Sequence, residues 1–367
     1  MRELVRRPGR FSTAAVILTL IAVLLMFLGG LLDGLIASAT GAIRAQDADV
    51  IVYSESSQAS FARSRIEPDV REAVTEVDGV AEVGGIGFVQ LGARVPDAGP
   101  RDLTGVALFG YEIPPSGVPA TPAPDQVHAD EVLRADGVEV GDELLLGPAR
   151  TPVTVVGFVS DTSYNGQGAL WAAPETWRAV VDENRPGARL ADGVFQALVV
   201  RAEPDTGPAP DELAAAIDAA TGGATLTLSI PDAVNAIPGV EEQQGTFGQI
   251  IGVTIAVALV VIALFFALIT VERAGLYGVL KALGARSGTI FAGLVAQAVV
   301  VTLVASAVAS GLVVLFDVLL PPGSVPLAVT PGHIGTSIVL LLVAAVVGCS
   351  FSLRRVLRID PASAIGS

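Results

Sequence analysis

The chain has 367 residues, of which 51% are hydrophobic and only 16% are charged, and its formal net charge is −15. Residues 47–245 carry 32 acidic and 11 basic side chains, whereas the rest of the chain carries 5 acidic and 11 basic ones. This distribution argues against a nucleic-acid-binding protein, because a phosphate backbone requires a basic surface, and it indicates a basic membrane part with an acidic domain outside the cytoplasm.

Four apolar segments are each long enough to cross a bilayer, which takes about 20 residues. They cover residues 11–37, 250–271, 290–315 and 334–353. Basic side chains precede the first segment, separate the second from the third, and follow the fourth. Four spans would bring all three basic clusters to the cytoplasmic side, so we expect a multi-pass membrane protein with both termini in the cytoplasm.

The first segment is expected to remain in the mature protein as a transmembrane helix. A cleavable signal peptide is the alternative, because Ala37, Ser38 and Ala39 resemble the small residues of a cleavage site. The apolar stretch is about twice as long as the usual apolar region of a signal peptide, which favours a retained span.

Near its outer end, the first span carries a candidate dimer seam and substrate path. Gly30 and Gly34 have the GxxxG spacing that lets two helices approach closely in lipid. Asp33 lies between them, and an acidic residue in a span is a functional candidate unless water reaches it at the interface. Met26 faces roughly the same side, and a thioether either ligates haem iron or simply packs. The alternative for the glycines is packing against the second or fourth span of the same chain.

Residues 45–244 are expected to form an exported domain of mixed α and β structure. Strand patterns rich in β-branched residues cover 49–54, 80–95, 138–146, 152–159 and 195–201, and helix patterns cover 68–77, 129–135 and 210–221. Residues 170–179 are predicted to be a strand that enters a helix at Pro174. The proline-rich segment 114–124 is either a surface loop, which we favour, or a boundary between two subdomains.

The segment 272–286, ERAGLYGVLKALGAR, is a short polar stretch between the second and third spans. It has a helical pattern, holds the only lysine of the chain, Lys281, and is expected on the cytoplasmic side, where it can meet a soluble partner. Gly284 is suited to end this helix, with Arg286 near the negative helix end. The alternative is that these charges only anchor the helix among lipid headgroups.

No catalytic, metal or cofactor motif stands out in the sequence. It lacks a GxxxxGK(S/T) phosphate loop, so the chain is not expected to hydrolyse ATP itself. His128 and His333 have no ligand spacing around them, and the single cysteine, Cys349, excludes an intrachain disulfide. We therefore expect no intrinsic cofactor, no metal site and no enzymatic activity in this chain.

Several stretches resemble the permeases of MacB/FtsX-type ABC systems, the type VII or mechanotransmission class. The order of one span, a large exported domain and three further spans is similar, and so are ERAGLYGVLKALGA after the second span and RRVLRIDPASAI at the end. HADEVLRADGVEVGDELLLG and TPVTVVGFV resemble the periplasmic core domain of that family. The start of the chain, RRPGRFSTAAVILTL, together with ADVIVYSESSQASFARSRI, resembles the haem-exporter (HrtB) and heterocyst-exporter (DevC) branch.

The resemblance implies a mechanism. Two permeases pair as a homodimer in a bacterial cytoplasmic membrane, and two cytoplasmic ATPase subunits bind ATP and close. Their movement passes through a coupling segment, residues 272–287, to the exported domain. Tyr277 departs from the family pattern, which often has an acidic residue there. The pattern maps onto Glu272, Arg273, Gly278, Lys281, Ala282, Leu283, Gly284 and Ala285.

The resemblance also divides the chain into residues 1–44 with the first span, the exported domain 45–244, and residues 245–367 with three spans. The function that it implies is ATP-driven export of a hydrophobic or amphipathic substrate, with haem as the best candidate. Two alternatives stay open: an FtsX-like permease that signals to an extracytoplasmic partner such as a wall hydrolase, and a macrolide or peptide efflux permease.

Overall fold

The computed structural model describes residues 8–96, 99, 102–272, 275, 279, 283, 285–319 and 325–357. The chain forms two compact units, a helical bundle and an α+β domain inserted between the first and second helices of that bundle. The bundle consists of Met1–Asp33, Gln244–Leu320 and Leu327–Ser367, and the inserted domain of Gly34–Gln243 and Pro321–Pro326.

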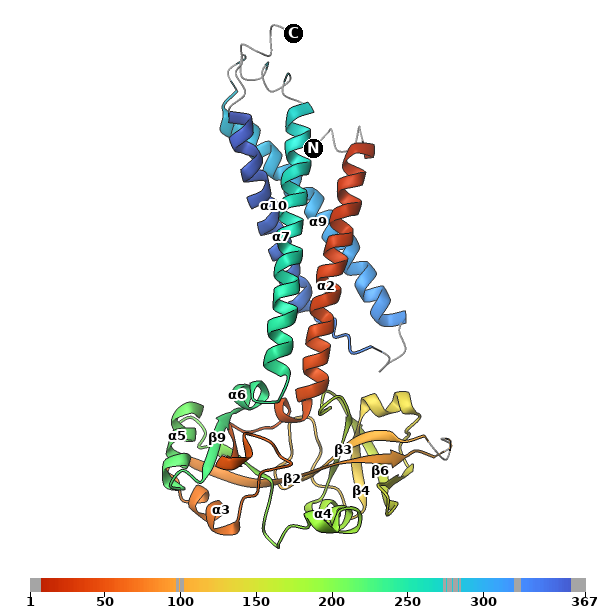
Figure 1. Cartoon of the computed structure of the whole chain (residues 1–367), viewed down its shortest axis with the longest axis vertical. Helices are drawn as coiled ribbons and strands as arrows, with labels where there is room; N and C mark the ends of the chain where they lie inside the picture. The colour runs from red at the N-terminus through yellow and green to blue at the C-terminus, as the bar shows by residue number, and fades with distance from the viewer. Residues whose placement is uncertain are drawn as a thin grey trace. The chain divides into compact units, whose positions relative to one another are not determined.

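The helical bundle is built from four long helices, which Figure 1 shows with their labels. They are α2 (Pro8–Arg44), α7 (Val240–Glu272), α9 (Ser287–Leu319) and α10 (Pro331–Leu357). Each is long and apolar enough to cross a membrane, and the candidate spans are Ala15–Arg44, Val240–Phe265, Phe291–Leu319 and Pro331–Ser350. The predicted fold class, four spans with a large α+β domain between the first and the second, is therefore confirmed.

Small side chains bring these helices together. Ala22, Ala258 and Ala309 are completely buried in one apolar cluster that combines α2, α7 and α9. At Gly348 of α10 an added Cβ would lie 3.0 Å from the carbonyl oxygen of Leu259, so this glycine lets α10 approach the backbone of α7. Close approach through small residues is the usual way in which helices pack in lipid.

The inserted domain is organised around a sheet of nine strands in the described chain, in the order β3-β7-β4-β6-β5-β2-β8-β1-β9. An additional pairing of β3 with β2 closes six of these strands into a ring. The strands are β1 (Val50–Ser54), β2 (Val80–Arg94), β3 (Thr104–Tyr111), β4 (Gln126–Asp130), β5 (Glu143–Leu146), β6 (Thr151–Val159), β7 (Gly168–Ala172), β8 (Ala197–Ala202) and β9 (Thr225–Ser229).

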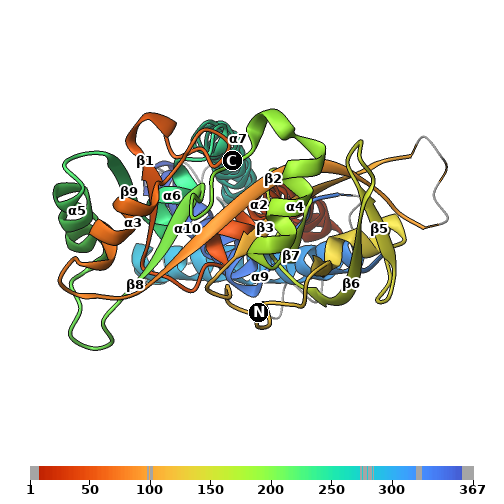
Figure 2. The ribbon, with the colours of Figure 1, turned by 90° about the horizontal axis from the view of Figure 1, so that it is seen from below.

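The long strand β2 connects the ring to the rest of the sheet. Its first half pairs with β8 and its second half with β3, both times antiparallel. Figure 2 shows β2 running from the side of β8 and β9 to the side of β5 and β6. Four helices cover the sheet, namely α3 (Pro68–Thr75), α4 (Pro174–Asn184), α5 (Pro210–Ala220) and α6 (Ile230–Asn235). Short 3-10 helices follow β1, β4 and α4, namely η1 (Glu55–Ser57), η2 (Glu131–Asp136) and η3 (Pro186–Ala188).

Alternation along the strands divides the core of this domain into two clusters, because successive side chains point to opposite faces. In β1, Val50 and Val52 join a cluster that includes residues of α3, α4 and α5. Ile51 and Tyr53 join a second cluster, which includes residues of α6 and the last turn of α2. The second cluster is rich in aromatic rings that contact one another, among them Phe61, Phe88, Phe109, Tyr164 and Trp171.

Two glycines that face each other across β2 and β3 make room for Trp177 of α4. Gly87 pairs with Gly110 in the register of the two strands. A Cβ on Gly110 would lie 2.6 Å from the Cβ of Trp177, and one on Gly87 would overlap its indole ring. The indole, which is 1% exposed, therefore lies directly on the backbone of both strands and fixes the position of α4.

Two predicted elements differ from the structure. The predicted strand 138–146 begins only at Glu143, because Gly137 and Gly141 adopt positive φ and form turns before it. The predicted helix 129–135 is instead the end of β4 followed by η2, since the carboxylate of Asp130 accepts a hydrogen bond from the amide of Val132 and starts a 3-10 turn there. The proline-rich segment 114–124 is a loop between β3 and β4 of one sheet.

Candidate functional site

The last turns of the first span contact the chain that enters the fourth span. The amide of Ala328 donates a hydrogen bond of 2.9 Å to the carbonyl of Gly30. A Cβ on Gly30 would lie 3.1 Å from Cδ1 of Leu327, and a Cβ on Gly29 would overlap the imidazole of His333. Both glycines are therefore required for this contact. It lies within one chain and joins α2 to the segment before α10 and to the first turn of α10.

His333 and Asp33 form the polar centre of this contact. Nδ1 of His333 lies 3.2 Å from Oδ2 of Asp33, and the two side chains are 20% and 42% exposed. The His333 amide donates to Oγ1 of Thr330, which precedes α10, and its Nε2 lies 3.5 Å from Oγ of Ser337. The backbone and the ring of His333 are thus both positioned, while Asp33 keeps a surface that a ligand can reach.

The other two predicted residues of this region lie elsewhere on α2. Met26 is 1% exposed, and its sulfur accepts a long hydrogen bond of 3.6 Å from Oγ of Ser310 in α9. Its thioether therefore already has a partner inside the bundle. Gly34 is buried. The structure brings Gly30 and Asp33 together with His333, whereas it places Met26 against α9.

A row of polar side chains on α9 was not predicted. In the part of the chain that the structure describes, Oε1 of Gln297 and the hydroxyls of Thr302 and Ser306 are buried and have no hydrogen-bond partner. Ser310 follows one turn after Ser306 and reaches Met26. The spacing of four residues from 302 to 310 is the helical repeat that would have revealed this row in an otherwise apolar span.

Most of the predicted coupling segment lies outside the described residues. Arg273, Gly278, Lys281, Ala282 and Gly284 belong to that part, and nothing structural is assigned to them. Three of the eight predicted coupling residues are described. Glu272 ends α7, Ala285 precedes α9, and Leu283 is 80% exposed, with its amide donating to the carbonyl of Val279 in a helical turn.

No metal centre is apparent among the described residues, since they contain no group of three or more histidine, cysteine, aspartate or glutamate side chains that could hold a metal ion. The Asp33–His333 pair is a polar contact in which the carboxylate remains partly exposed.

The last third of the chain matches a known domain family. Residues 249–361, which contain the last three spans, match the model described as FtsX-like permease C-terminal. In sequence, the chain is 22% identical over 242 residues to a putative hemin transport system permease protein HrtB of Staphylococcus epidermidis. A protein of the same description from Staphylococcus haemolyticus is 26% identical over 110 residues, 30% of this chain and 31% of its own length.

These sequence matches are partial, and the structural ones are distant. The Staphylococcus epidermidis match covers 66% of this chain and 63% of the relative. Among solved structures, the periplasmic region of MacB from Actinobacillus actinomycetemcomitans has a TM-score of 0.37 and 15% identity, over 54% of this chain and 96% of that one. The extracellular domain of the ABC-type transporter YknZ from Gram-positive bacteria has a TM-score of 0.32 and 15% identity, over 50% of this chain and all of that domain.

Proposed function

We propose that the chain is a MacB/FtsX-type ABC transporter permease of the HrtB branch and that it exports a hydrophobic or amphipathic substrate, with haem as the substrate we favour. The observation that carries the proposal is the similarity over 242 residues to relatives that are described as putative hemin transport permeases. The similarity is not limited to the family domain, because it covers 242 residues whereas that domain covers only residues 249–361.

The energy for export is supplied, in this proposal, by two copies of a separate cytoplasmic ATPase that bind the segment 272–287. Leu283 supports this placement, since an apolar side chain that is 80% exposed gains free energy when a partner covers it. Both termini and this segment then lie on the cytoplasmic side of a bacterial plasma membrane, and the acidic domain lies on the other side.

The substrate path in this proposal passes Asp33. The permease works as a homodimer, and an amphiphile enters from the lipid between the two copies near the end of the first span. Its polar edge contacts the exposed part of the Asp33 carboxylate, which His333 positions from the far side at 3.2 Å. Haem brought to this place would meet an imidazole and a carboxylate, both of which can ligate or hydrogen-bond an iron porphyrin.

The test is an ATPase assay of the permease reconstituted in lipid nanodiscs with its ATPase subunit. Haem is expected to raise the rate of ATP hydrolysis above the basal rate, and iron-free protoporphyrin is the matched control for the metal. Stimulation by a macrolide but not by haem would instead support the efflux alternative. ATP-dependent activation of a wall hydrolase, without any response to haem, would support the signalling alternative.

A further inference from the structure

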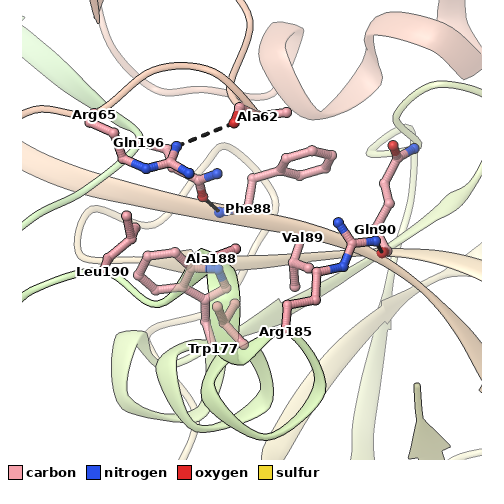
Figure 3. Close-up of a pocket in the computed structure, with 11 residues that line it drawn as sticks. Ala62, Arg65, Phe88, Val89, Gln90, Trp177, Arg185, Ala188, Leu190 and Gln196 are labelled. Atoms are coloured by element: carbon pink, nitrogen blue, oxygen red, sulfur yellow. Dashed lines mark hydrogen bonds between the residues drawn. The ribbon is translucent and has the colours of Figure 1, made fainter. Parts of the chain in front are cut away.

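A pocket of about 120 Å³ opens in the exported domain between β2, the end of α4 and the segment that follows η1. Its apolar walls are the side chains of Phe88, Val89, Trp177 and Leu190. Figure 3 shows these side chains together with Arg65 and Arg185, which lie on different sides of the pocket. The pocket thus combines an apolar interior with two guanidinium groups at its margin.

The two arginines are held in place without an acidic partner. Arg65 donates to the carbonyl oxygens of Ala62 and Ser64, and Arg185 donates to the carbonyl of Gln90 at 2.6 Å. Among the described residues neither of them forms an ion pair. By contrast, three other arginines of the same domain, Arg71, Arg189 and Arg201, are paired with carboxylates.

The pocket thus carries two positive charges without a carboxylate, although residues 47–245 hold 32 acidic but only 11 basic side chains. Burial lowers the pKa of Arg65, so its charge has lost part of its hydration without gaining a carboxylate. The margin of the pocket therefore carries positive charge that, among the described residues, no carboxylate neutralises.

The polar amides of the pocket are, in contrast, already engaged. Gln196 accepts from the amide of Phe88 at 2.5 Å and donates to the carbonyl of Phe61 at 3.0 Å, and the side chain of Gln90 donates to Gln167. These bonds keep the wall rigid. Two kinds of group remain for a ligand. One is apolar carbon, and the other is the guanidinium N–H groups, which prefer carboxylate or phosphate oxygens.

We propose that this pocket binds an organic carboxylate with a small apolar body. The carboxylate accepts hydrogen bonds from Arg65 or Arg185, and the apolar body lies against Trp177 and Leu190. A closed apolar cavity of about 150 Å³ holds one benzene molecule, so the apolar body that this open pocket of about 120 Å³ takes is no larger than one six-membered ring. The site does not depend on the export proposal, since it requires neither ATP nor haem.

The test uses the fluorescence of Trp177 in the purified full-length protein. The chain has two tryptophans, and Trp171 stacks on Phe109 in the other core cluster, so Trp171→Phe leaves Trp177 as the single reporter. Titration with cyclohexanecarboxylate is expected to change its emission with saturation. Cyclohexylmethanol, which has the same body without the charge, and inorganic phosphate, which has charge without the body, are expected to produce no saturable change.

Variants of the two arginines complete the test. Arg65→Gln and Arg185→Gln are made separately, and at least one of them should raise the Kd for cyclohexanecarboxylate by about tenfold, the effect of losing one charge-assisted hydrogen bond. Arg63→Gln is the matched control, since Arg63 lies two positions from Arg65 but bonds to Gln58. The thermal unfolding midpoint of each variant shows that it is folded. Saturation by the alcohol or by phosphate, or a Kd that neither arginine variant changes, would overturn the proposal.

Discussion

The side chains of Asp33 and His333 lie 3.2 Å apart between Oδ2 and Nδ1, although they come from opposite ends of the chain. His333 reaches Asp33 by lying across Gly29, where a Cβ would overlap its ring. The first span and the start of α10 are therefore joined by an imidazole that requires a glycine beneath it.

Replacement of that glycine tests the contact. Gly29→Ala should destabilise the protein by about 1–3 kcal/mol through overpacking, which outweighs the roughly 0.5–1 kcal/mol that alanine gains over glycine in a helix. The measurement is the thermal unfolding midpoint of the purified full-length protein. Gly311→Ala in α9 is the matched control, since nothing lies within 4 Å of its added Cβ, and its midpoint should stay the same or rise.

The double variant identifies the cause. If the His333 ring produces the strain, Gly29→Ala should cost much less stability in a protein that already carries His333→Ala than in the unchanged protein. An equal loss in both backgrounds would mean that the imidazole does not lie on Gly29.

The role of Asp33 in substrate binding gives a second prediction. Asp33→Asn keeps the size of the side chain and removes its charge. In the haem-stimulated ATPase assay it should weaken the affinity for haem about tenfold, while the basal rate of ATP hydrolysis stays unchanged. Ser337→Ala is a suitable control, because Ser337 lies beside the same imidazole but is 2% exposed. A haem response of Asp33→Asn equal to that of the unchanged protein would remove Asp33 from the substrate path.

The strands and helices of the inserted domain were largely predictable, because their apolar periodicity is local. The predicted strands at 49–54 and 195–201 correspond to β1 and β8, and the predicted helix at 210–221 corresponds to α5. The strand β3 was missed: it carries two glycines, Gly105 and Gly110, which weaken a strand pattern. Gly110 is there because Trp177 occupies the space of its side chain, and that is a tertiary reason.

The candidate site was only half predictable for the same reason. Asp33 and Gly30 were conspicuous because charge and glycine are unusual in an apolar span. His333 was judged isolated, since no ligand spacing surrounds it in the sequence, and only the approach of α10 to α2 makes it the neighbour of Asp33. Packing of the glycines against the second or fourth span of the same chain was the stated alternative to a dimer seam, and Gly30 lies against Leu327, shortly before the fourth span. A first-span dimer seam at Gly30 and Gly34 stays a prediction.

The packing of Trp177 on strands β2 and β3 gives a third prediction. Gly87→Ala places a methyl group where the indole lies, so it should destabilise the protein by about 1–3 kcal/mol and shift the emission of Trp177. Gly92→Ala in the same strand is the matched control, because its nearest neighbour, Cδ1 of Leu103, is 3.4 Å away at ordinary contact distance. Equal unfolding midpoints for the two variants would contradict this packing.

The coupling segment gives a fourth prediction. Leu283→Asp, Gly284→Val and the double charge reversal Arg273→Glu with Lys281→Glu should each reduce copurification of the ATPase subunit with the permease. Membrane insertion should not change, because the spans are untouched. Leu103→Asp is the control, because it also places a charge at an exposed leucine. Leu103 is 58% exposed and belongs to the inserted α+β domain rather than to the helical bundle. Normal ATPase binding by all three variants would exclude this segment as the coupling element.

Topology gives the fifth prediction, and it separates the two sides of the membrane directly. Cysteines are introduced one at a time as Ser56→Cys, Ser287→Cys and Ser367→Cys, and intact cells are treated with a membrane-impermeant thiol reagent. The unchanged protein is the control, since its single Cys349 is 2% exposed. Ser56→Cys should react in intact cells, because residue 56 is exposed in the acidic domain. The other two should react only after permeabilisation, because basic residues next to spans stay on the cytoplasmic side. Labelling of Ser287→Cys in intact cells would place the connection between α7 and α9 outside, where a cytoplasmic ATPase cannot reach it, and the coupling proposal would fail with the four-span orientation.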